Sequence, residues 1–298
     1  MICYYHMSDL DGQCSGAIVK YYHPSCRMVG LRYDDKVNWN DVIGQDVVMV
    51  DISLRPIENM ISVAKLAKKM VWIDHHKSII DQYDEFRDVF GKKFVAILSD
   101  ERLGNYRAAC ELTWEFFSGK RYIPIGIHLI GRYDVWDHEA HPDVLPFQYG
   151  MRMYDTFPVE KYMDTVWNRV IEDDQSFYLD TVEKGKAVFQ FVNKDFSAFR
   201  RANAFESVID GYRCICLNRI SVNSRIFGDL IYDYDMAVIF GYKGKGKWKV
   251  SFYTARDDVD VSRIAEKYGG GGHKHASGAI VNNIDFILKG EKHVSQDS

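Results

Sequence analysis

The chain has 298 residues, of which 47% are hydrophobic and 27% are charged. This composition is typical of a globular protein, and at roughly 150 residues per domain the length predicts about two domains. The 38 Lys and Arg residues against 42 Asp and Glu give a formal net charge of -4, which argues against a protein that coats nucleic acid with a basic surface. No apolar run approaches the roughly 20 residues of a membrane span, and the sequence opens on a strand-like stretch rather than a signal peptide. We therefore expect a cytoplasmic protein without membrane contact.

The first 140 residues predict short apolar strands that alternate with amphipathic helices. Strands are expected at residues 1–5, 28–33, 47–50, 70–73 and 94–98. A helix is expected from Pro56 to about Lys69, where apolar residues recur at helical spacing. Such an alternation predicts a mostly parallel sheet that is covered on both faces.

The remainder of the chain predicts helices and then a second set of strands. Amphipathic helices are expected at residues 111–117, 159–170 and 175–192, and strands at 207–209, 212–217, 236–242 and 248–253. We therefore expect an α/β protein with a parallel-sheet catalytic domain at residues 1–190, a linker at 191–204, and a smaller α/β substrate-binding domain at 205–298. The active-site cleft is expected between the two domains.

Polar side chains with metal-binding capacity follow several of the predicted strands. His6 ends the first strand, Asp9 and Asp11 lie in the loop after it, and Asp51 follows the strand at 47–50. The strand at 70–73 is followed by Asp74, His75 and His76. Because ligands of open parallel sheets bind outside the carboxyl ends of the strands, these side chains are expected to converge at one edge.

Converging carboxylates repel one another, so one or two divalent cations are their natural partners. A set of Asp and His without Cys favours Mn²⁺ or Mg²⁺ over structural zinc. Asp134, which follows another apolar stretch, could complete the cluster. The alternative for each Asp taken singly is a helix cap or a turn residue, so the prediction depends on the conjunction at consecutive strand ends.

A run of four glycines precedes His273 in the second predicted domain. Gly270, Gly271 and Gly272 permit positive φ angles and a close approach of the backbone to a ligand such as a phosphate. A flexible linker is the alternative, but the run lies between a helix-like segment at 261–268 and the apolar residues 279–281. This context favours an ordered binding loop.

Together these segments resemble a DHH-family phosphoesterase with the DHH-associated C-terminal domain, most like the compact oligoribonuclease (nano-RNase) type. The matching pieces occur in the family's order and span nearly the whole chain. They are Asp9-Leu10-Asp11-Gly12, Asp51, Asp74-His75-His76, Arg107-Ala108-Ala109-Cys110-Glu111, Asp134, Gly270-Gly271-Gly272-His273 and Ala276-Ser277-Gly278.

The resemblance implies a hydrolase of phosphoester or phosphoanhydride bonds that uses two Mn²⁺, with Mg²⁺ or another divalent ion as alternatives. By position, Asp9 would hold one ion, Asp51 would bridge both, and Asp11, His75 and Asp134 would hold the second. Asp74 would orient His75, and His76 would contact the substrate phosphate.

For the second domain the resemblance implies that Gly271, Gly272 and His273 bind the nucleotide or the phosphate of the substrate that lies farthest from the metal ions.

The sequence departs from the family's pattern at two places. Only two residues separate His6 from Asp9, where the family often has three, so His6 either binds metal or lines the site. Many relatives carry an Arg in the strand before the glycine run, where this chain has Tyr253, a residue that could stack on a base, and Arg256 could supply the charge.

The expected function is Mn²⁺-dependent exonucleolytic hydrolysis of short single-stranded oligonucleotides to mononucleotides. Hydrolysis of cyclic dinucleotides, of 3′-phosphoadenosine 5′-phosphate or of polyphosphate is the alternative within enzymes, because the same ions would serve. A catalytically silent nucleotide-binding module is the alternative outside enzymes. Arg107 is a further candidate for substrate binding. The oligomeric state stays open, with a homodimer as one option.

Overall fold

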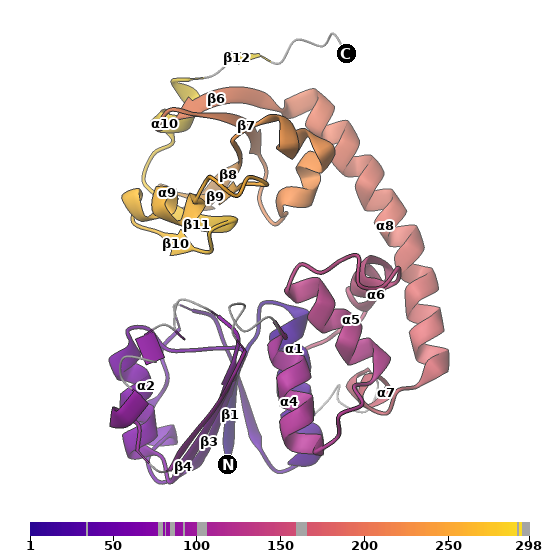
Figure 1. Ribbon diagram of the computed structural model, residues 1–298, viewed down its shortest axis with the longest axis vertical. Coiled ribbons are helices and arrows are strands. Elements are labelled where there is room, and N and C mark those ends of the chain that lie inside the picture. Colours follow the sequence, from indigo (N-terminus) through magenta and orange to yellow (C-terminus); the bar gives the residue numbers. More distant parts are fainter. Residues whose placement is uncertain are drawn as a thin grey trace. The chain divides into compact units, whose positions relative to one another are not determined.

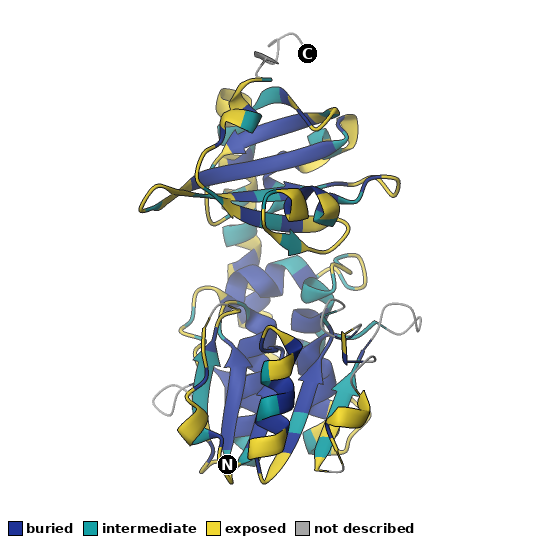
Figure 2. Cartoon of the chain, turned by 90° about the vertical axis from the view of Figure 1, so that its left-hand side faces the viewer, coloured by how far each residue is buried: buried dark blue, intermediate teal, exposed yellow. Residues whose placement is uncertain are grey.

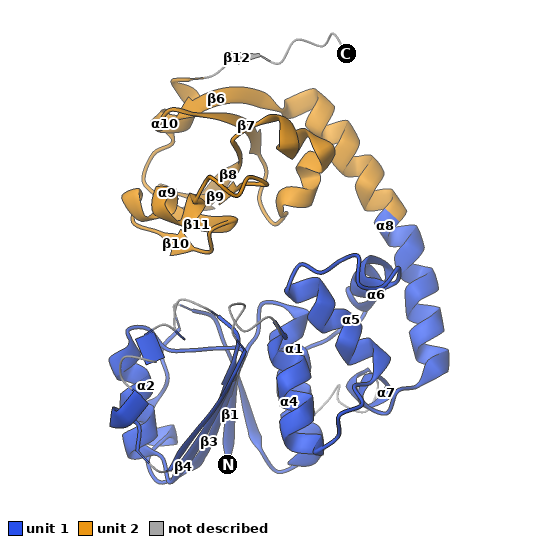
Figure 3. Ribbon diagram, viewed as in Figure 1, with its two compact units in different colours: residues 1–189 blue, residues 190–298 orange. Residues whose placement is uncertain are grey.

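The computed structural model describes residues 1–33, 35–76, 80, 82–83, 87–91, 93–99, 106–158, 166–290 and 292–293. The chain forms two compact units, residues 1–189 and residues 190–298 (Figure 3). The boundary falls within helix α8 (Gln175–Asn203), so most of the segment expected as a linker is helical. Among the described residues, no helix combines the length and the apolar character needed to cross a membrane.

Unit 1 is built on a parallel sheet, as the sequence predicts. Its strands are β1 (Ile2–His6), β2 (Arg27–Leu31), β3 (Asp46–Val50), β4 (Lys69–Asp74) and β5 (Phe94–Leu98). They are ordered β2-β1-β3-β4-β5 and every pair is parallel. The direction of the crossovers therefore reverses between β1 and β3, which is the place where ligands bind in doubly wound folds of this strand order.

Helices cover both faces of this sheet (Figure 1). On one face, helix α2 (Ile57–Leu66) buries Ile57 and Met60 against strand residues such as Trp72. On the other face, α1 (Leu10–Tyr22) and α4 (Ala109–Ser118) bury Val19 and Leu112 against Val48 and Ile73. The central strands β1, β3 and β4 are buried on both sides and appear dark along most of their length in Figure 2, whereas the edge strands β2 and β5 are mostly of intermediate burial.

A helical layer follows the sheet along the chain. It consists of α5 (Ile125–Asp134), α6 (Val144–Met151), α7 (Trp167–Ile171) and the start of α8. These helices share one hydrophobic cluster with α1 and α4, in which Trp167, Phe147 and Ile127 are fully buried or nearly so. Residues 159–165 of the helix expected at 159–170 lie outside the described residues. Short 3-10 helices lie at Trp39–Asp41 (η1) and Arg87–Val89 (η2).

Unit 2 contains a second, largely antiparallel sheet. In chain order its strands are β6 (Phe205–Ile209), β7 (Tyr212–Asn218), β8 (Met236–Gly244), β9 (Lys247–Tyr253), β10 (Gly271–Gly272), β11 (Ala276–Val281) and β12 (Lys292–His293). Helices α9 (Val261–Lys267) and α10 (Asp285–Leu288) pack on one face, and the 3-10 segment η4 (Ser224–Asp233) packs on the other with the end of α8. The predicted α/β class is therefore confirmed for both units.

Candidate metal centre

The carboxyl edge of the parallel sheet in unit 1 gathers acidic and imidazole side chains. His6 is the last residue of β1, Asp51 follows β3 directly, and Asp74 ends β4. Across the point where the strand order reverses, His6 Nδ1 lies 3.5 Å from Asp51 Oδ2. The sheet topology alone thus explains why side chains more than forty positions apart in the sequence meet here.

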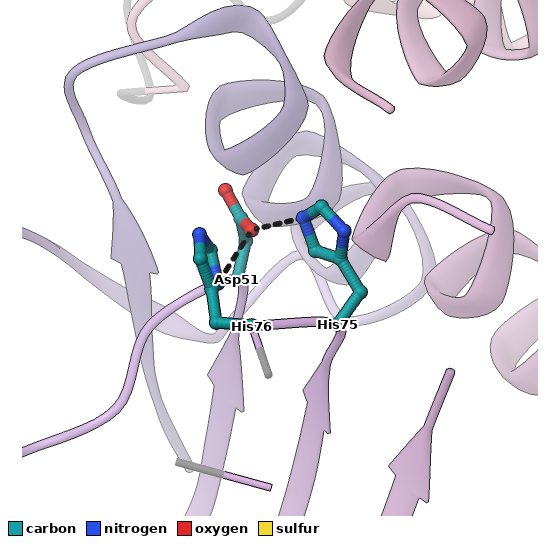
Figure 4. Close-up of side chains that lie close together, drawn as sticks. All are labelled: Asp51, His75 and His76. Carbon is teal, nitrogen blue, oxygen red and sulfur yellow. Dashed lines mark ion pairs between the residues drawn. The ribbon is translucent and has the colours of Figure 1, made fainter. Parts of the chain in front are cut away.

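The side chains form three overlapping groups whose ligand atoms lie within 4.8 Å of one another. The groups are His6, Asp9 and Asp51; Asp11, His75 and Asp134; and Asp51, His75 and His76. Figure 4 shows the third group, with the Asp51 carboxylate between the two imidazoles. All six metal ligands that the sequence pattern and the resemblance predict are therefore close together, including His6, whose role the spacing left open.

The carboxylate of Asp51 faces two different sets of neighbours. Its Oδ1 atom lies 3.4 Å from His75 Nε2, and its Oδ2 atom lies 3.5 Å from His6 Nδ1. His6 Nδ1 is also 3.0 Å from Asp9 Oδ2. His75 Nε2 is 3.1 Å from Asp134 Oδ2 and 3.5 Å from Asp11 Oδ2. Asp51 therefore joins two ligand sets, as a bridging carboxylate would.

Hydrogen bonds from backbone amides fix the carboxylates of the two Asp residues that follow β1. Asp9 is the N-cap of α1, and its Oδ1 atom accepts a hydrogen bond of 3.0 Å from the Gly12 amide. Asp11 lies in the first turn of α1, and its carboxylate faces the N-terminus of α4, where the amides of Ala109 and Cys110 donate to its two oxygens at 3.0 and 2.7 Å. Exposed amides at a helix N-terminus stabilise a carboxylate. Both carboxylates can therefore accept hydrogen bonds from a helix N-terminus and bind a metal ion at the same time.

Burial and mutual repulsion perturb these groups. Burial raises the pKa of Asp11 well above its usual range, and the negative charges of Asp51 and Asp134 add to the effect. Burial alone would lower the pKa of His6, but its contacts with Asp51 and Asp9 raise it to about 11. Burial alone would raise the pKa of Asp51, but His6 and His75 hold it below its usual range. Such crowding of carboxylates is what bound cations relieve.

Asp74 organises the segment after β4 rather than binding at the centre of the cluster. It is fully buried, and its Oδ2 atom accepts from Trp72 Nε1 at 3.1 Å. Its Oδ1 atom accepts from the amides of His75 and His76 and contacts His76 Nδ1 at 2.6 Å. The ring that Asp74 orients is therefore that of His76, which corrects the expectation that it orients the ring of His75. The reason is local, because the backbone amides of His75 and His76 both donate to Asp74 Oδ1 and hold His76 beside this carboxylate.

Tyr33 is a member of this site that sequence reasoning missed. Its hydroxyl lies 2.7 Å from His76 Nε2, and its ring centroid lies 4.8 Å from that of His6. Tyr33 follows β2, the strand next to β1, so the carboxyl end of a neighbouring strand was the available signal. The two ring nitrogens of His76 are thus contacted from both sides, by Asp74 and by Tyr33.

The predicted substrate residues lie apart from this cluster in the sequence. Arg107 belongs to unit 1, where its guanidinium contacts Glu115 and the Glu111 carbonyl. In unit 2, Tyr253 ends β9 and is partly buried. Arg256 forms ion pairs with Asp235 and Asp258, so its charge is already engaged.

The glycine run forms an ordered hairpin between β10 and β11. Gly271 pairs with Gly278 and Gly272 with Ser277, and the His273 amide donates to the Ala276 carbonyl at 2.8 Å. A Cβ at Gly270 would lie 2.1 Å from the Gly278 carbonyl oxygen, and one at Gly272 would lie 2.6 Å from Ser277 Cα. A Cβ at Gly271 would meet no atom of the described part of the chain within 4 Å. Packing therefore requires glycine at two of these positions but not at Gly271.

Comparison with known proteins shows which domain family the second unit matches. Residues 224–294, which include this hairpin, match the DHHA1 domain. The whole chain is similar to Oligoribonuclease NrnB of Bacillus subtilis, at 22% identity over 95% of this chain and 74% of that protein. It is also similar to an uncharacterized protein of Acanthamoeba polyphaga mimivirus, at 23% identity over 97% of this chain and 69% of that protein. The second unit therefore contains a DHHA1 domain, and nearly the whole chain is similar to an oligoribonuclease.

Solved structures share the fold of this chain. The pGpG-specific phosphodiesterase PggH from Vibrio cholerae superposes with a TM-score of 0.53 at 14% identity, over 95% of this chain and 94% of that one. The DHH domain of a protein described as a member of the s1p family of ribosomal proteins superposes with a TM-score of 0.56 at 12% identity, over 94% and 82% of the two chains. At these identities the similarity shows the fold.

The side chains at the carboxyl edge of the parallel sheet fit divalent cations. Asp51 Oδ1, His75 Nε2 and His6 Nδ1 are buried and form no hydrogen bond with any residue that the structure describes. Buried polar atoms without partners are costly, and coordination to a cation removes that cost. The donors are carboxylate oxygens and imidazole nitrogens, a set that suits Mn²⁺ or Mg²⁺.

Proposed function

We propose that this chain is a DHH-family phosphoesterase and acts as an Mn²⁺-dependent exonuclease that hydrolyses short oligoribonucleotides to mononucleotides. The observation that carries the proposal is the Asp51 carboxylate, whose two oxygens face separate ligand sets 3.4 and 3.5 Å away. Two-metal sites need such a bridging group to hold the ions close together. The similarity to an oligoribonuclease over 95% of this chain supports the choice of substrate.

In this proposal each ligand set holds one ion. His6, Asp9 and Asp51 would hold the first, and Asp11, Asp51, His75 and Asp134 would hold the second. Bound there, the ions would supply an activated water at neutral pH and stabilisation of charge on the phosphate.

The chain's own contribution at this site is the placement of His76. Asp74 and Tyr33 contact its two ring nitrogens at 2.6 and 2.7 Å, which fixes the ring beside Asp51. From this place His76 would contact a phosphate oxygen of the substrate and orient the phosphodiester. Asp74 and Tyr33 would be positioning residues, because they act through His76.

The second unit is proposed to bind the rest of the nucleotide. Backbone N–H groups of a glycine-rich turn suit a phosphate, and the open position at Gly271 leaves room for such a group. His273 and Tyr253 would add polar and stacking contacts, and Arg107 would contribute from unit 1. A formal net charge of -4 suits a short substrate, because a long strand would require an extended basic groove.

A product time course on 5′-labelled short RNA and matched DNA with Mn²⁺ tests this proposal. We expect mononucleotides to accumulate stepwise from RNA, and no cleavage by the Asp51→Asn variant under the same conditions. The order in which labelled products appear also gives the direction of degradation.

Parallel reactions with a cyclic dinucleotide, 3′-phosphoadenosine 5′-phosphate and inorganic polyphosphate separate the alternatives. Faster turnover of any of these than of linear RNA would replace the proposed substrate while keeping the metal centre. Normal oligonucleotide binding without cleavage of any substrate would instead indicate a nucleotide-binding module.

A further inference from the structure

Two residues after the end of α5, the helix that carries Asp134, lies an exposed tryptophan with an unusual backbone conformation. Trp136 has a φ of 62°, the left-handed conformation that glycine usually adopts after a helix. Its amide donates to the Tyr133 carbonyl at 3.2 Å, and the Asp137 amide donates to the Arg132 carbonyl at 2.8 Å. These two bonds form the usual glycine-terminated helix end. The indole is 54% exposed, so neither the turn nor the core accounts for tryptophan here.

The ring of Trp136 belongs to a row of aromatic side chains, which we call the aromatic platform: Trp136, His138 and Tyr133. The ring centroids of Trp136 and His138 are 4.5 Å apart, and those of His138 and Tyr133 are 5.0 Å apart with an interplanar angle of 25°. Arg152 donates to the Tyr133 hydroxyl at 3.3 Å. The supporting rings are thus held by their neighbours, so little conformational entropy remains to be lost when a ligand binds.

The aromatic platform lies next to the candidate metal centre along the chain. Trp136 is two residues after Asp134, so the two Cα atoms are at most about 7.6 Å apart. Asp134 in turn contacts His75 at 3.1 Å. A flat, exposed ring therefore stands within a short reach of the place where a phosphate would be bound.

We propose that Trp136 stacks on a nucleobase of the substrate whose phosphate lies at the metal centre. The proposal rests on the proposed function, because it assumes that the metal centre receives a nucleotide phosphodiester. Every base presents a π face, so stacking on an aromatic side chain binds nucleotides with little sequence preference. A nucleobase is thus the ligand chemistry that matches an exposed indole beside a phosphate site, and His138 and Tyr133 act as its support.

Equilibrium binding of two hydrolysis-resistant probes tests the proposal. The first probe is a 5′-phosphorylated diadenylate whose bridging phosphate carries a methylene in place of one ester oxygen, and the second is the same molecule without its bases. We expect Trp136→Ala to weaken binding of the first probe by about 5- to 150-fold, the range that corresponds to one stacked base. Binding of the abasic probe is expected to stay unchanged, and Trp136→Phe is expected to retain most of the affinity.

Trp39→Ala is the matched control, since Trp39 is another exposed tryptophan of unit 1, at 39%. It is expected to bind both probes as the wild type does. The proposal is overturned if the wild type does not prefer the probe with bases, or if Trp136→Ala weakens both probes equally. These outcomes are independent of the proposed function, which fails instead if the wild type binds the probes but does not cleave the natural diadenylate with Mn²⁺.

Discussion

At the scale of single residues, Asp51 combines a strained backbone with the central position in the candidate metal centre. It has a φ of 55°, and its amide donates to the Ile73 carbonyl at 2.9 Å, directly after the pairing of β3 with β4. Asp and Asn tolerate the left-handed region better than most residues, and such strain is often found at functional sites. The charge of Asp51 can therefore be removed without changing its backbone preference.

We expect Asp51→Asn to lower Mn²⁺ affinity by about 100-fold or more and to abolish hydrolysis. Because Asn accepts the same φ, the metal-free variant should retain the fold. Calorimetric titration with Mn²⁺ and circular dichroism measure the two properties, with Asp88→Asn, a change at an exposed carboxylate of unit 1, as the control. Wild-type Mn²⁺ binding by Asp51→Asn would contradict the bridging role.

The left-handed backbone at Trp136 favours glycine, whereas the proposed stacking on a base requires an aromatic side chain at this position. Non-glycine residues in the left-handed region carry a cost of about 1–2 kcal/mol, partly offset by the larger chain entropy that glycine loses on folding. We therefore expect Trp136→Gly to be more stable than Trp136→Ala by up to about 1 kcal/mol. Urea unfolding of the two variants measures the difference, and an alanine variant at least as stable as the glycine variant would refute the strain argument.

At the scale of elements, a buried carboxylate fixes the distance between α4 and α5. Glu111 in α4 is 2% exposed. One of its oxygens lies 2.9 Å from His128 Nδ1, and the other forms an ion pair with Arg132 and accepts from the Ala108 amide at 3.3 Å. A Cβ at Gly131 would lie 2.8 Å from the Glu111 side chain, so only glycine allows this approach. The contact links the helix whose N-terminus binds Asp11 to the helix that carries Asp134.

This network predicts that the wild type and a Glu111→Gln variant differ in free energy of unfolding by an amount that depends on pH. Burial alone would raise the pKa of Glu111, but His128 and Arg132 hold it below its usual value of 4.5. A lowered pKa means that the ionised group stabilises the fold above 4.5 and that this stabilisation is lost as pH falls through the lowered pKa. We expect Glu111→Gln to lower the free energy of unfolding by about 1–3 kcal/mol near neutral pH. The difference in free energy of unfolding between this variant and the wild type should become smaller below about pH 4.

Urea unfolding of both proteins at several pH values measures this gap. Glu115→Gln in the same helix is the control, because the Glu115 side chain is 47% exposed and its ion pair with Arg107 should contribute little. A gap that stays constant into acid would show that shape and hydrogen bonding, rather than the charge of Glu111, stabilise the helix pair.

At the scale of the whole molecule, the parts that could be predicted from sequence are those that depend on local pattern. Apolar strands followed by His6, Asp51 and Asp74 predict both the sheet and the edge where these residues meet, because parallel strands end together. The contact of Asp11 with the start of α4 spans 98 positions and depends on helix packing, so no local pattern reveals it. Asp134 is similar, since it ends a helix and reaches the site only through the packing of α5. The final length of α8 also exceeded the expected 175–192, because its amphipathic pattern continues to Asn203.

The two units predict that metal binding and substrate binding can be changed separately. Among the residues that the structure describes, the candidate ligands of the metal centre all belong to residues 1–189, whereas the glycine hairpin belongs to residues 190–298. We expect Gly271→Ala to keep the wild-type Mn²⁺ affinity and melting temperature, because its Cβ would contact none of the described residues within 4 Å. Its KM for a short oligoribonucleotide should rise about tenfold, or ~1.4 kcal/mol, because the methyl group would occupy the space proposed for the nucleotide. Steady-state kinetics and Mn²⁺ titration measure these quantities, with Ile280→Ala on the neighbouring strand as the control at an exposed position. An unchanged KM for Gly271→Ala would remove Gly271 from the substrate contacts, and a loss of Mn²⁺ affinity would mean that the two functions are not separate.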